Sequence, residues 1–281
     1  MKTHPSIQVP TVLSIAGFDG SGGAGIQADT KTISALGGYA MNVLTALPIQ
    51  NTMGVQNIYP IPVKAVEEQL TCLFADTNPD TIKIGMIHHG QLVETIANFL
   101  KDYRGRVVFD PVMVSTSGHR LIDTDTTQAI VDKLFPLADI ITPNLDEISV
   151  LLNRDMKTLY DMEQAIQPIL DLGVKAALLK GGHLKGPELT SILAQTDQPS
   201  SYFTHPRVAT RNTHGSGCTL SSAIATYLAF GFSIKEATQQ ALDYVHGAIS
   251  AGKDLEIGKG NGPLNHFFNP QKLKTKKHIN N

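Results

Sequence analysis

The chain has 281 residues, of which 42% are hydrophobic and 17% are charged, and its formal net charge at pH 7 is -2. These values are typical of a globular protein with a large core, and they exclude the basic surface that nucleic-acid binding requires. The two cysteines, Cys72 and Cys218, have neither metal-ligand nor disulfide spacing. The N-terminus lacks an apolar signal-peptide core, and no run of about 18 apolar residues occurs. We therefore expect a cytoplasmic protein without a membrane segment.

Short apolar runs alternate with longer helical patterns along the whole chain. Residues 12–17 are expected to form a buried strand, and residues 24–36 a helix that ends at paired glycines. Residues 41–49 are expected to form the second strand, and Pro62 fits the first turn of the next helix. Later elements are expected as strands at residues 81–86, 106–110, 138–142 and 175–180, with helices between and after them.

The apolar character of these strands is nearly continuous, which favours a parallel sheet covered by helices on both faces. No linker-like stretch divides the chain, so we expect one domain over residues 11–268, a short extension at residues 1–10 and a basic, disordered tail at residues 269–281. Ligands of open parallel sheets bind outside the carboxyl ends of the strands. The notable side chains at these expected ends are those of Asp19, Gln50, Met86, Asp110, Asn144 and Lys180.

The segment from Asn212 to Cys218 reads NTHGSGC and leads directly into a run of good helix formers. Its glycines and small residues would expose backbone N–H groups at the positive end of a helix, an arrangement suited to holding an anion. Cys218 lies where the helix dipole would lower the pKa of a thiol, although a buried structural cysteine is the alternative. Cys72, on the apolar face of a predicted helix, is expected in the core. The segment predicts phosphoryl transfer to a small acceptor.

Residues 20–25 satisfy the dinucleotide-binding pattern G-x-G-x-x-G. A nicotinamide-binding protein would carry an acid near the end of its second strand, and here that strand ends at Gln50 without one. We therefore interpret the glycines as allowing a substrate to approach the backbone closely, and keep a Rossmann-type NAD-dependent oxidoreductase as a remote alternative. The Walker A pattern is absent, so a kinase would need another phosphate site.

Several polar positions leave two interpretations open. Asp29 lies in an apolar helix and is either an exposed helix acid or a pocket residue that accepts hydrogen bonds from a polar heterocycle. Asn144 is first of all a helix cap, yet it shares a helix face with Glu147 and, with Asp110, offers oxygen ligands for hydrated Mg²⁺. Lys180 precedes two glycines at a strand end and is either solvated or close to a phosphate.

Taken together, the chain resembles the hydroxymethylpyrimidine/phosphomethylpyrimidine kinases of thiamine biosynthesis, within the ribokinase-like superfamily. The matching segments fall in order at residues 16–17, 21–29, 50–52, 83–86, 110–114, 142–144, 180–183 and 213–219. The resemblance implies a three-layer α/β/α fold with a mostly parallel central sheet, ATP as cosubstrate, Mg²⁺ as cofactor and a homodimer. The implied reactions are phosphorylation of 4-amino-5-hydroxymethyl-2-methylpyrimidine (hydroxymethylpyrimidine) and then of its monophosphate, to give the pyrophosphate.

The resemblance also implies roles for single residues. The anion hole that carries catalysis would consist of Gly215, Ser216, Gly217 and Cys218. The residues next to the aminopyrimidine would be Gly17, Asp29, Gln50, Met86 and Val112. The nucleotide phosphates would contact Lys180, Asn144 and Thr213, and Mg²⁺ would be held through water by Asp110 and Glu147. In the first step a Cys218 thiolate would accept the hydroxyl proton, and in the second step the acceptor is already anionic and needs little base.

Two positions depart from the family pattern. Pro48 stands where relatives usually have a small apolar residue, and Thr116 stands where a Lys is common. The nearest alternative function is a pyridoxine/pyridoxal kinase of the same fold. Gln50 favours the aminopyrimidine, because its amide can both donate and accept hydrogen bonds to an amino group and a ring nitrogen. A pyrimidine-binding protein without catalytic activity is disfavoured by the glycine-cysteine anion site. Partners beyond small molecules, such as nucleic acid or a membrane, are not expected.

Overall fold

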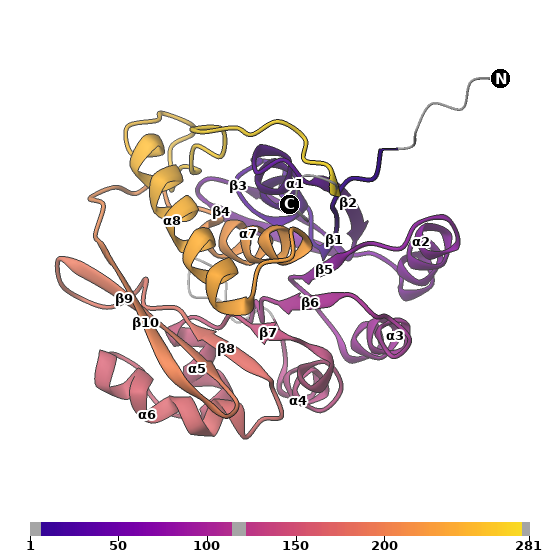
Figure 1. Ribbon diagram of the computed structural model, residues 1–281, viewed down its shortest axis with the longest axis horizontal. Coiled ribbons are helices and arrows are strands. Elements are labelled where there is room, and N and C mark those ends of the chain that lie inside the picture. The colour runs from indigo at the N-terminus through magenta and orange to yellow at the C-terminus, as the bar shows by residue number, and fades with distance from the viewer. Residues whose placement is uncertain (1–6, 114–121, 277–281) are drawn as a thin grey trace.

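The computed structural model describes residues 7–113 and 122–276, so Thr116 lies outside the described residues. The strands of its main sheet are β1 (Thr11–Ala16), β2 (Tyr39–Leu44), β5 (Thr81–Ile84), β6 (Arg106–Phe109), β7 (Ile140–Ile141), β8 (Ala176–Leu179), β9 (Glu188–Gln195) and β10 (Gln198–Pro206). Their order is β10-β9-β8-β7-β6-β5-β1-β2 (Figure 1). Strands β1, β2 and β5 to β8 are parallel, whereas β9 and β10 join as antiparallel neighbours. The predicted, mostly parallel sheet is confirmed.

Helices cover both faces of this sheet. They are α1 (Gly25–Ala35), α2 (Val63–Asp76), α3 (Gly90–Leu100), α4 (Thr124–Lys133), α5 (Leu145–Leu152), α6 (Leu159–Leu170), α7 (Ser216–Ala229) and α8 (Ile234–Gly252), with a 3-10 turn, η1 (Phe135–Leu137). Helices α2 to α6 share one core with Leu13 of β1, and α1, α7 and α8 share the other with Val12. Neighbouring strand residues serve opposite cores because their side chains alternate between the faces. The result is the predicted three-layer α/β/α fold.

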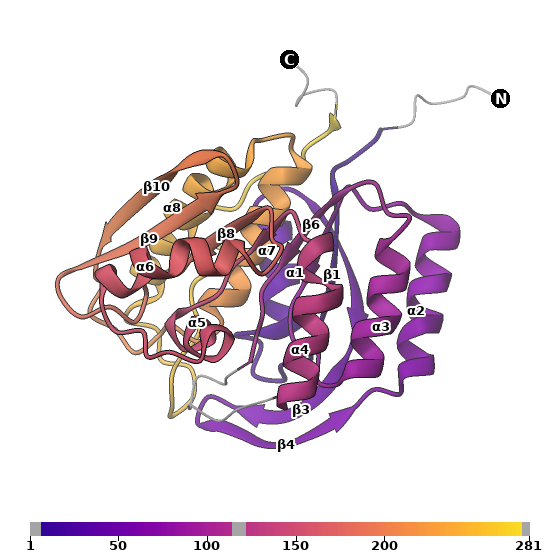
Figure 2. The ribbon, with the colours of Figure 1, turned by 90° about the horizontal axis from the view of Figure 1, so that it is seen from below.

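The second predicted strand, residues 41–49, is in fact two strands in different sheets. Strand β2 ends at Leu44, and Thr45 then donates its backbone N–H to Ala16 (3.0 Å) and its hydroxyl to the carbonyl of Met86 (2.8 Å). The chain continues as β3 (Ala46–Asn51), which pairs with β4 (Gly54–Pro60) in a two-stranded antiparallel sheet. Figure 2 shows this hairpin lying across one end of the main sheet. The break could not be recognised in the sequence, because the apolar residues 41–49 continue through it and each of the two strands buries some of them.

Two features at the edge of the domain bear on the predictions: Cys72, which was expected in the core, and the C-terminal tail, which was expected to be disordered. Cys72 is exposed, because the buried face of α2 is formed by Val66 and Leu70 instead. The described part of the tail lies along the molecule: Gln271 donates to the carbonyl of Ala35 (2.7 Å), and residue 276 is the last one described. The domain boundaries at residues 10 and 268 stay predictions. Within the described ranges, no helix has the length and apolarity needed to cross a membrane.

Candidate active site

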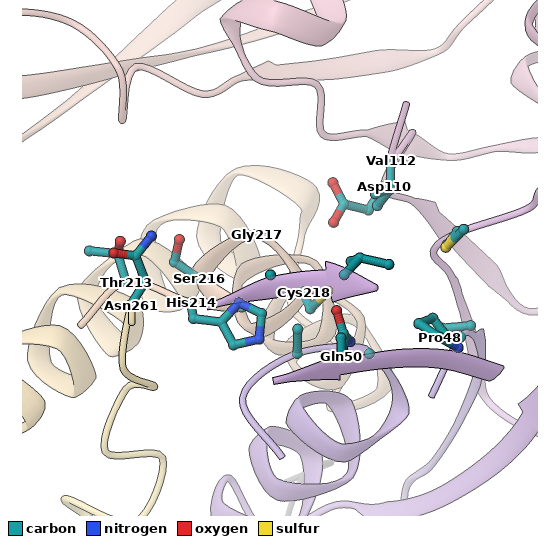
Figure 3. A pocket seen from close by; sticks show the side chains of 18 of the residues that line it. Pro48, Gln50, Asp110, Val112, Thr213, His214, Ser216, Gly217, Cys218 and Asn261 are labelled. Atoms are coloured by element: carbon teal, nitrogen blue, oxygen red, sulfur yellow. The ribbon is translucent and has the colours of Figure 1, made fainter. Parts of the chain in front are cut away.

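A cavity of about 380 Å³ opens at the carboxyl ends of the parallel strands, between the β3–β4 hairpin and the start of α7 (Figure 3). The structure brings together at this cavity the predicted residues Gly17, Gln50, Met86, Asp110, Val112, Asn144, Glu147, Lys180, Thr213, Gly215, Ser216, Gly217 and Cys218. Of the predicted site residues, only Asp29 is absent from the described lining. The cavity forms where parallel-sheet topology predicts it.

The start of α7 is built to face a ligand. Gly215 precedes the helix with a φ of 80°, and a Cβ on it would lie 1.8 Å from the carbonyl oxygen of Gly23. Only glycine permits this turn, which presses the segment before α7 against the glycine-rich loop. A Cβ on Gly217 would lie 3.4 Å from Nζ of Lys180. Within the described part of the chain, no side chain caps α7. The helix dipole and the Lys180 ammonium therefore meet in one corner, which we call the anion-binding corner because it suits a phosphate.

Lys180 belongs to a buried group of opposite charges. Its Nζ lies 2.8 Å from Oδ1 of Asp110 and 3.8 Å from Oε2 of Glu147. Burial opposes ionisation of Asp110, but Lys180 and Lys83 hold the pKa of its carboxyl below the ordinary value. Burial raises the pKa of Glu147 to about 7; Asp110 adds to this shift and Lys180 opposes it. The pKa values of the two carboxyls are thus shifted in opposite directions.

Asn144 and Glu147 form a capping box at the start of α5. Oδ1 of Asn144 accepts the N–H of Glu147 (2.9 Å), and Oε2 of Glu147 accepts the N–H of Asn144 (2.7 Å). The predicted cap is confirmed, and it fixes the carboxyl of Glu147 beside Lys180. Among the described residues, no cluster of three or more acidic, His or Cys side chains could hold a metal. The two carboxyls instead suit a hydrated Mg²⁺ that takes its other ligands from substrate phosphates.

The expected lowering of the Cys218 pKa is wrong. Burial raises the pKa of this thiol to about 11, helped by the carboxylates of Asp29 and Asp110 and opposed by Lys83 and the N–H of Gly25. The cost of burying a thiolate is the largest cause of this shift, and it exceeds the opposing effect of the Lys83 ammonium. At neutral pH the residue is a thiol, so a resting thiolate is not the proton acceptor at this site.

Asp29 lies beneath the cavity instead of in its wall. The side chain is completely buried, so the exposed-acid interpretation is wrong. Its carboxylate contacts Lys83 at 2.8 Å and accepts hydroxyl hydrogen bonds from Ser14 (2.5 Å) and Ser222 (2.7 Å). These partners use the oxygens that a heterocycle was expected to contact. The signal that the sequence offered was a lysine inside the apolar strand TIKI, since a buried ammonium requires a buried partner.

A second buried carboxylate, that of Asp19, organises the glycine-rich loop. It accepts the backbone N–H groups of Ser21 (2.9 Å) and Ala24 (2.7 Å) and contacts Nε2 of His214 at 2.9 Å. Burial opposes its ionisation, yet the hydrogen bonds from His214, Ser21 and Ala24 hold the pKa of Asp19 well below the ordinary value. The N–H groups of the loop therefore donate to the Asp19 carboxylate. In a dinucleotide-binding protein such groups would donate to a phosphate instead. His214 has no predicted role, although it lies inside the NTHGSGC segment.

The opposite end of the cavity is formed by the hairpin. A register shift between Ile49 and Gln50 bulges β3, and Nε2 of Gln50 lies 3.4 Å from the carbonyl of Phe18. Bulges redirect side chains, and this one places Gln50 in the cavity wall. Pro48 is buried and lines the cavity beside it, so the departure from the family pattern falls on the pocket itself. Figure 3 shows Asp110 and Val112 across from Thr213 and Asn261.

The fold and the site define a class of protein: a small-molecule kinase of the ribokinase-like superfamily. The family model described as phosphomethylpyrimidine kinase matches residues 19–265. Over 260 residues the chain is 44% identical to the hydroxymethylpyrimidine/phosphomethylpyrimidine kinase of Rhizobium meliloti, covering 91% of this chain and 96% of that protein. The chain belongs to the hydroxymethylpyrimidine/phosphomethylpyrimidine kinase family, and the oxidoreductase alternative is wrong.

Solved structures agree with this assignment. The phosphomethylpyrimidine kinase of Clostridium difficile matches with a TM-score of 0.74 and 40% identity, covering 85% of this chain and 99% of that one. The Bacillus subtilis pyridoxal kinase, solved as an ADP complex, matches with a TM-score of 0.85 and 34% identity, covering 92% of this chain and 98% of that one. The same fold therefore serves kinases named for two different ring substrates.

Proposed function

We propose that the protein transfers a phosphoryl group from ATP to hydroxymethylpyrimidine and then a second one to the resulting monophosphate. The observation that carries this proposal is the meeting of two unlike surfaces in one cavity. One consists of the start of α7 and Lys180, and the other of Gln50, Met86 and Val112. The first surface suits a phosphate and the second a flat, polar ring.

The chain's own residues supply what phosphoryl transfer chiefly needs, which is positioning and neutralisation of charge. The amide of Gln50 would orient the ring by donating to its nitrogen and accepting from its amino group. The N–H groups at the start of α7 and the Lys180 ammonium would face the phosphoryl group. Because burial raises the pKa of Cys218 to about 11, we assign this thiol to the cavity wall and not to a resting base.

Mg²⁺ belongs to the proposal as a companion of the nucleotide. Asp110 and Glu147 would hold it through water, and it would neutralise phosphate charge when bound. Both carboxyls lie close to the Lys180 ammonium, which leaves them few positions for direct metal ligation. A cation held mainly by phosphates and water fits such a site.

We further propose a homodimer formed through the β3–β4 hairpin. Two large apolar side chains that do not line the cavity, those of Ile49 and Tyr59, are exposed on it. Exposed apolar patches of this kind mark interaction surfaces. Sedimentation should give a dimer for the parent protein and a monomer for Tyr59→Asp, whereas Tyr160→Asp, an exposed tyrosine of α6, should stay dimeric. A cytoplasmic location also belongs to the proposal, and the two unpaired cysteines support it.

The test of function is ADP release by the purified protein with MgATP and four separate acceptors: hydroxymethylpyrimidine, its monophosphate, pyridoxine and pyridoxal. We expect turnover of both pyrimidines and slower turnover of the pyridine rings. Activity on pyridoxal alone would replace the proposal by the pyridoxal kinase alternative. Gln50→Met should lower kcat/KM for hydroxymethylpyrimidine more than for pyridoxal, because methionine removes the paired donor and acceptor.

A further inference from the structure

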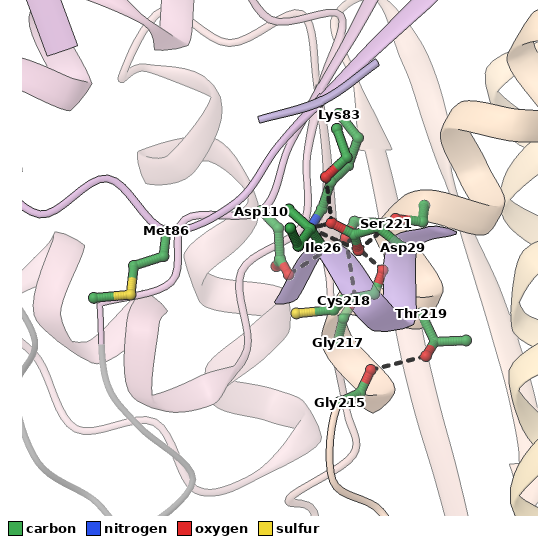
Figure 4. Close-up of polar contacts among 12 residues, drawn as sticks. Ile26, Asp29, Lys83, Met86, Asp110, Gly215, Gly217, Cys218, Thr219 and Ser221 are labelled. Atoms are coloured by element: carbon green, nitrogen blue, oxygen red, sulfur yellow. Dashed lines mark hydrogen bonds and ion pairs between the residues drawn. The ribbon is translucent and has the colours of Figure 1, made fainter. Parts of the chain in front are cut away.

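Lys83 is a fully buried cation at the floor of the cavity. It lies in the middle of β5, and its Nζ lies 3.0 and 2.8 Å from the two carboxylate oxygens of Asp29 on α1 (Figure 4). Burial opposes the charge, but Asp29 holds the pKa of Lys83 above its ordinary value. A Cβ on Gly85 would lie 2.9 Å from Nζ, so this glycine leaves the room that the ammonium occupies. The pair is charged and closely packed.

The Asp29 carboxylate connects this pair to the helix that begins at the anion-binding corner. It accepts the hydroxyl of Ser222, which lies in α7 four residues after Cys218. Residues four apart lie on the same face of a helix, one turn from each other. Asp29 therefore holds α7 between one and two turns below the N–H groups that would face a phosphate. Figure 4 shows Asp29 and Lys83 gathered beside the first turns of α7.

A carboxylate in this position creates an electrostatic problem. An uncompensated negative charge beneath the start of α7 would oppose the helix dipole and repel a bound phosphate, and burial would leave that repulsion poorly screened. The Lys83 ammonium contacts both oxygens of the carboxylate and cancels its charge over longer distances. The hydrogen bond to Ser222 stays available while the positive potential at the start of α7 is kept.

We propose that Lys83 is a positioning residue for the phosphate end of the cavity: it neutralises Asp29, so that Asp29 can hold α7 through Ser222 without weakening anion binding. This inference rests on the proposed phosphate site at α7 but not on the identity of the ring substrate. A protein that bound nucleotide and failed to phosphorylate hydroxymethylpyrimidine would still allow it to be tested.

A purely structural role and the proposed role of the ion pair predict different changes in phosphate affinity when one or the other member is removed. Removing either member of a buried ion pair destabilises a fold. If that were the whole effect, Lys83→Met and Asp29→Asn would impair ligand binding in the same direction. If the charge matters, Lys83→Met leaves a buried anion and weakens phosphate binding, whereas Asp29→Asn leaves a buried cation and preserves or strengthens it.

The experiment measures binding of the non-hydrolysable ATP analogue AMP-PCP and of adenosine to the full-length protein by calorimetry. We expect Lys83→Met to weaken AMP-PCP binding about tenfold or more while changing adenosine binding less than about twofold. Asp29→Asn should bind AMP-PCP at least as tightly as the parent. Ser222→Ala separates the two parts of the proposal: it removes the hydrogen bond to α7 and keeps both charges, so it should weaken AMP-PCP binding, but by less than Lys83→Met does.

A double variant keeps the test decisive if Lys83→Met does not fold. Lys83→Gln combined with Asp29→Asn replaces the ion pair by a neutral amide pair of similar size. Relative to Asp29→Asn alone, it should bind AMP-PCP about tenfold more weakly, since the two differ only at position 83, where glutamine lacks the positive charge. Equal weakening of AMP-PCP binding in both single variants, or equal affinities of Asp29→Asn and the double variant, would overturn the proposal.

Discussion

Lys180 lies between two carboxyls whose pKa values are shifted in opposite directions. Its Nζ lies 2.8 Å from Asp110, whose carboxyl has a lowered pKa, and 3.8 Å from Glu147, whose pKa is raised to about 7. The ammonium therefore pairs with Asp110 first, and the proton that Glu147 retains limits the negative charge around it. With a pKa of about 7, Glu147 is about half ionised at pH 7, so the corner that an arriving phosphate meets is less negative than two full carboxylates would make it.

This arrangement makes Lys180 the first residue to test. We expect Lys180→Met to lower kcat with hydroxymethylpyrimidine by about 10²- to 10³-fold, the usual loss when one donor to a transition-state anion is removed. Steady-state kinetics with saturating MgATP measure the effect. Lys185→Met, an exposed lysine five residues further along, is the matched control and should keep its kcat. A loss confined to KM for ATP would mean that Lys180 binds the nucleotide without assisting transfer.

A second prediction concerns the turn before α7. Gly215→Ala should destabilise the protein by on the order of 2 kcal/mol and abolish measurable turnover, because its φ of 80° disfavours alanine and its Cβ would meet Gly23. Urea unfolding and turnover of hydroxymethylpyrimidine test the two effects. Gly90→Ala is the control, since a Cβ there meets nothing within 4 Å. Full activity of Gly215→Ala would show that the turn can relax without moving the start of α7.

Much of this site could be predicted from sequence, because ligands of parallel sheets bind at the carboxyl ends of the strands. Asp110 and Lys180 each follow a strand of one parallel sheet, so topology alone brings them together. Topology does not say which way a side chain points. The family resemblance placed Asp29 at the ligand, and the residues alone left it either exposed or in the pocket, whereas the structure buries it. Its partner Lys83 lies 54 residues away, and Asp19 and His214 lie 195 residues apart, so no local pattern joins them. The break at Thr45 was invisible for a similar reason, since it depends on a hydrogen bond to Met86.

The raised pKa of Cys218 gives a prediction about pH. With a pKa of about 11, roughly one thiol in 10⁴ is ionised at pH 7, so a thiolate base would make the first phosphorylation about tenfold faster per pH unit. We expect instead a rate that is nearly flat between pH 7 and 9, and a loss below about 100-fold in Cys218→Ala. Single-turnover rates with hydroxymethylpyrimidine provide the measurement. A tenfold rise per pH unit in the parent that disappears in Cys218→Ala would restore Cys218 as the proton acceptor.

The final prediction concerns Glu147 and the pH dependence of stability. Its pKa rises from 4.5 to about 7 on folding, so the unfolded chain loses this proton at lower pH than the folded protein does. The stability that the retained proton contributes is fully present below pH 4.5 and is lost as the pH rises to 7, a change of at most about 3 kcal/mol. Glu147→Gln cannot ionise. Its stability relative to the parent should therefore increase between pH 4.5 and 7 and then stay constant.

Urea unfolding of the parent and the variant at intervals from pH 4.5 to 8 measures this difference, and other titrating groups cancel because both proteins carry them. Glu68→Gln is the matched control, because it makes the same substitution at an exposed glutamate of α2. Its difference from the parent should not vary over this pH range. If the difference for Glu147→Gln were equally constant, the carboxyl would be ionised throughout. The Lys180 ammonium would then face two full negative charges.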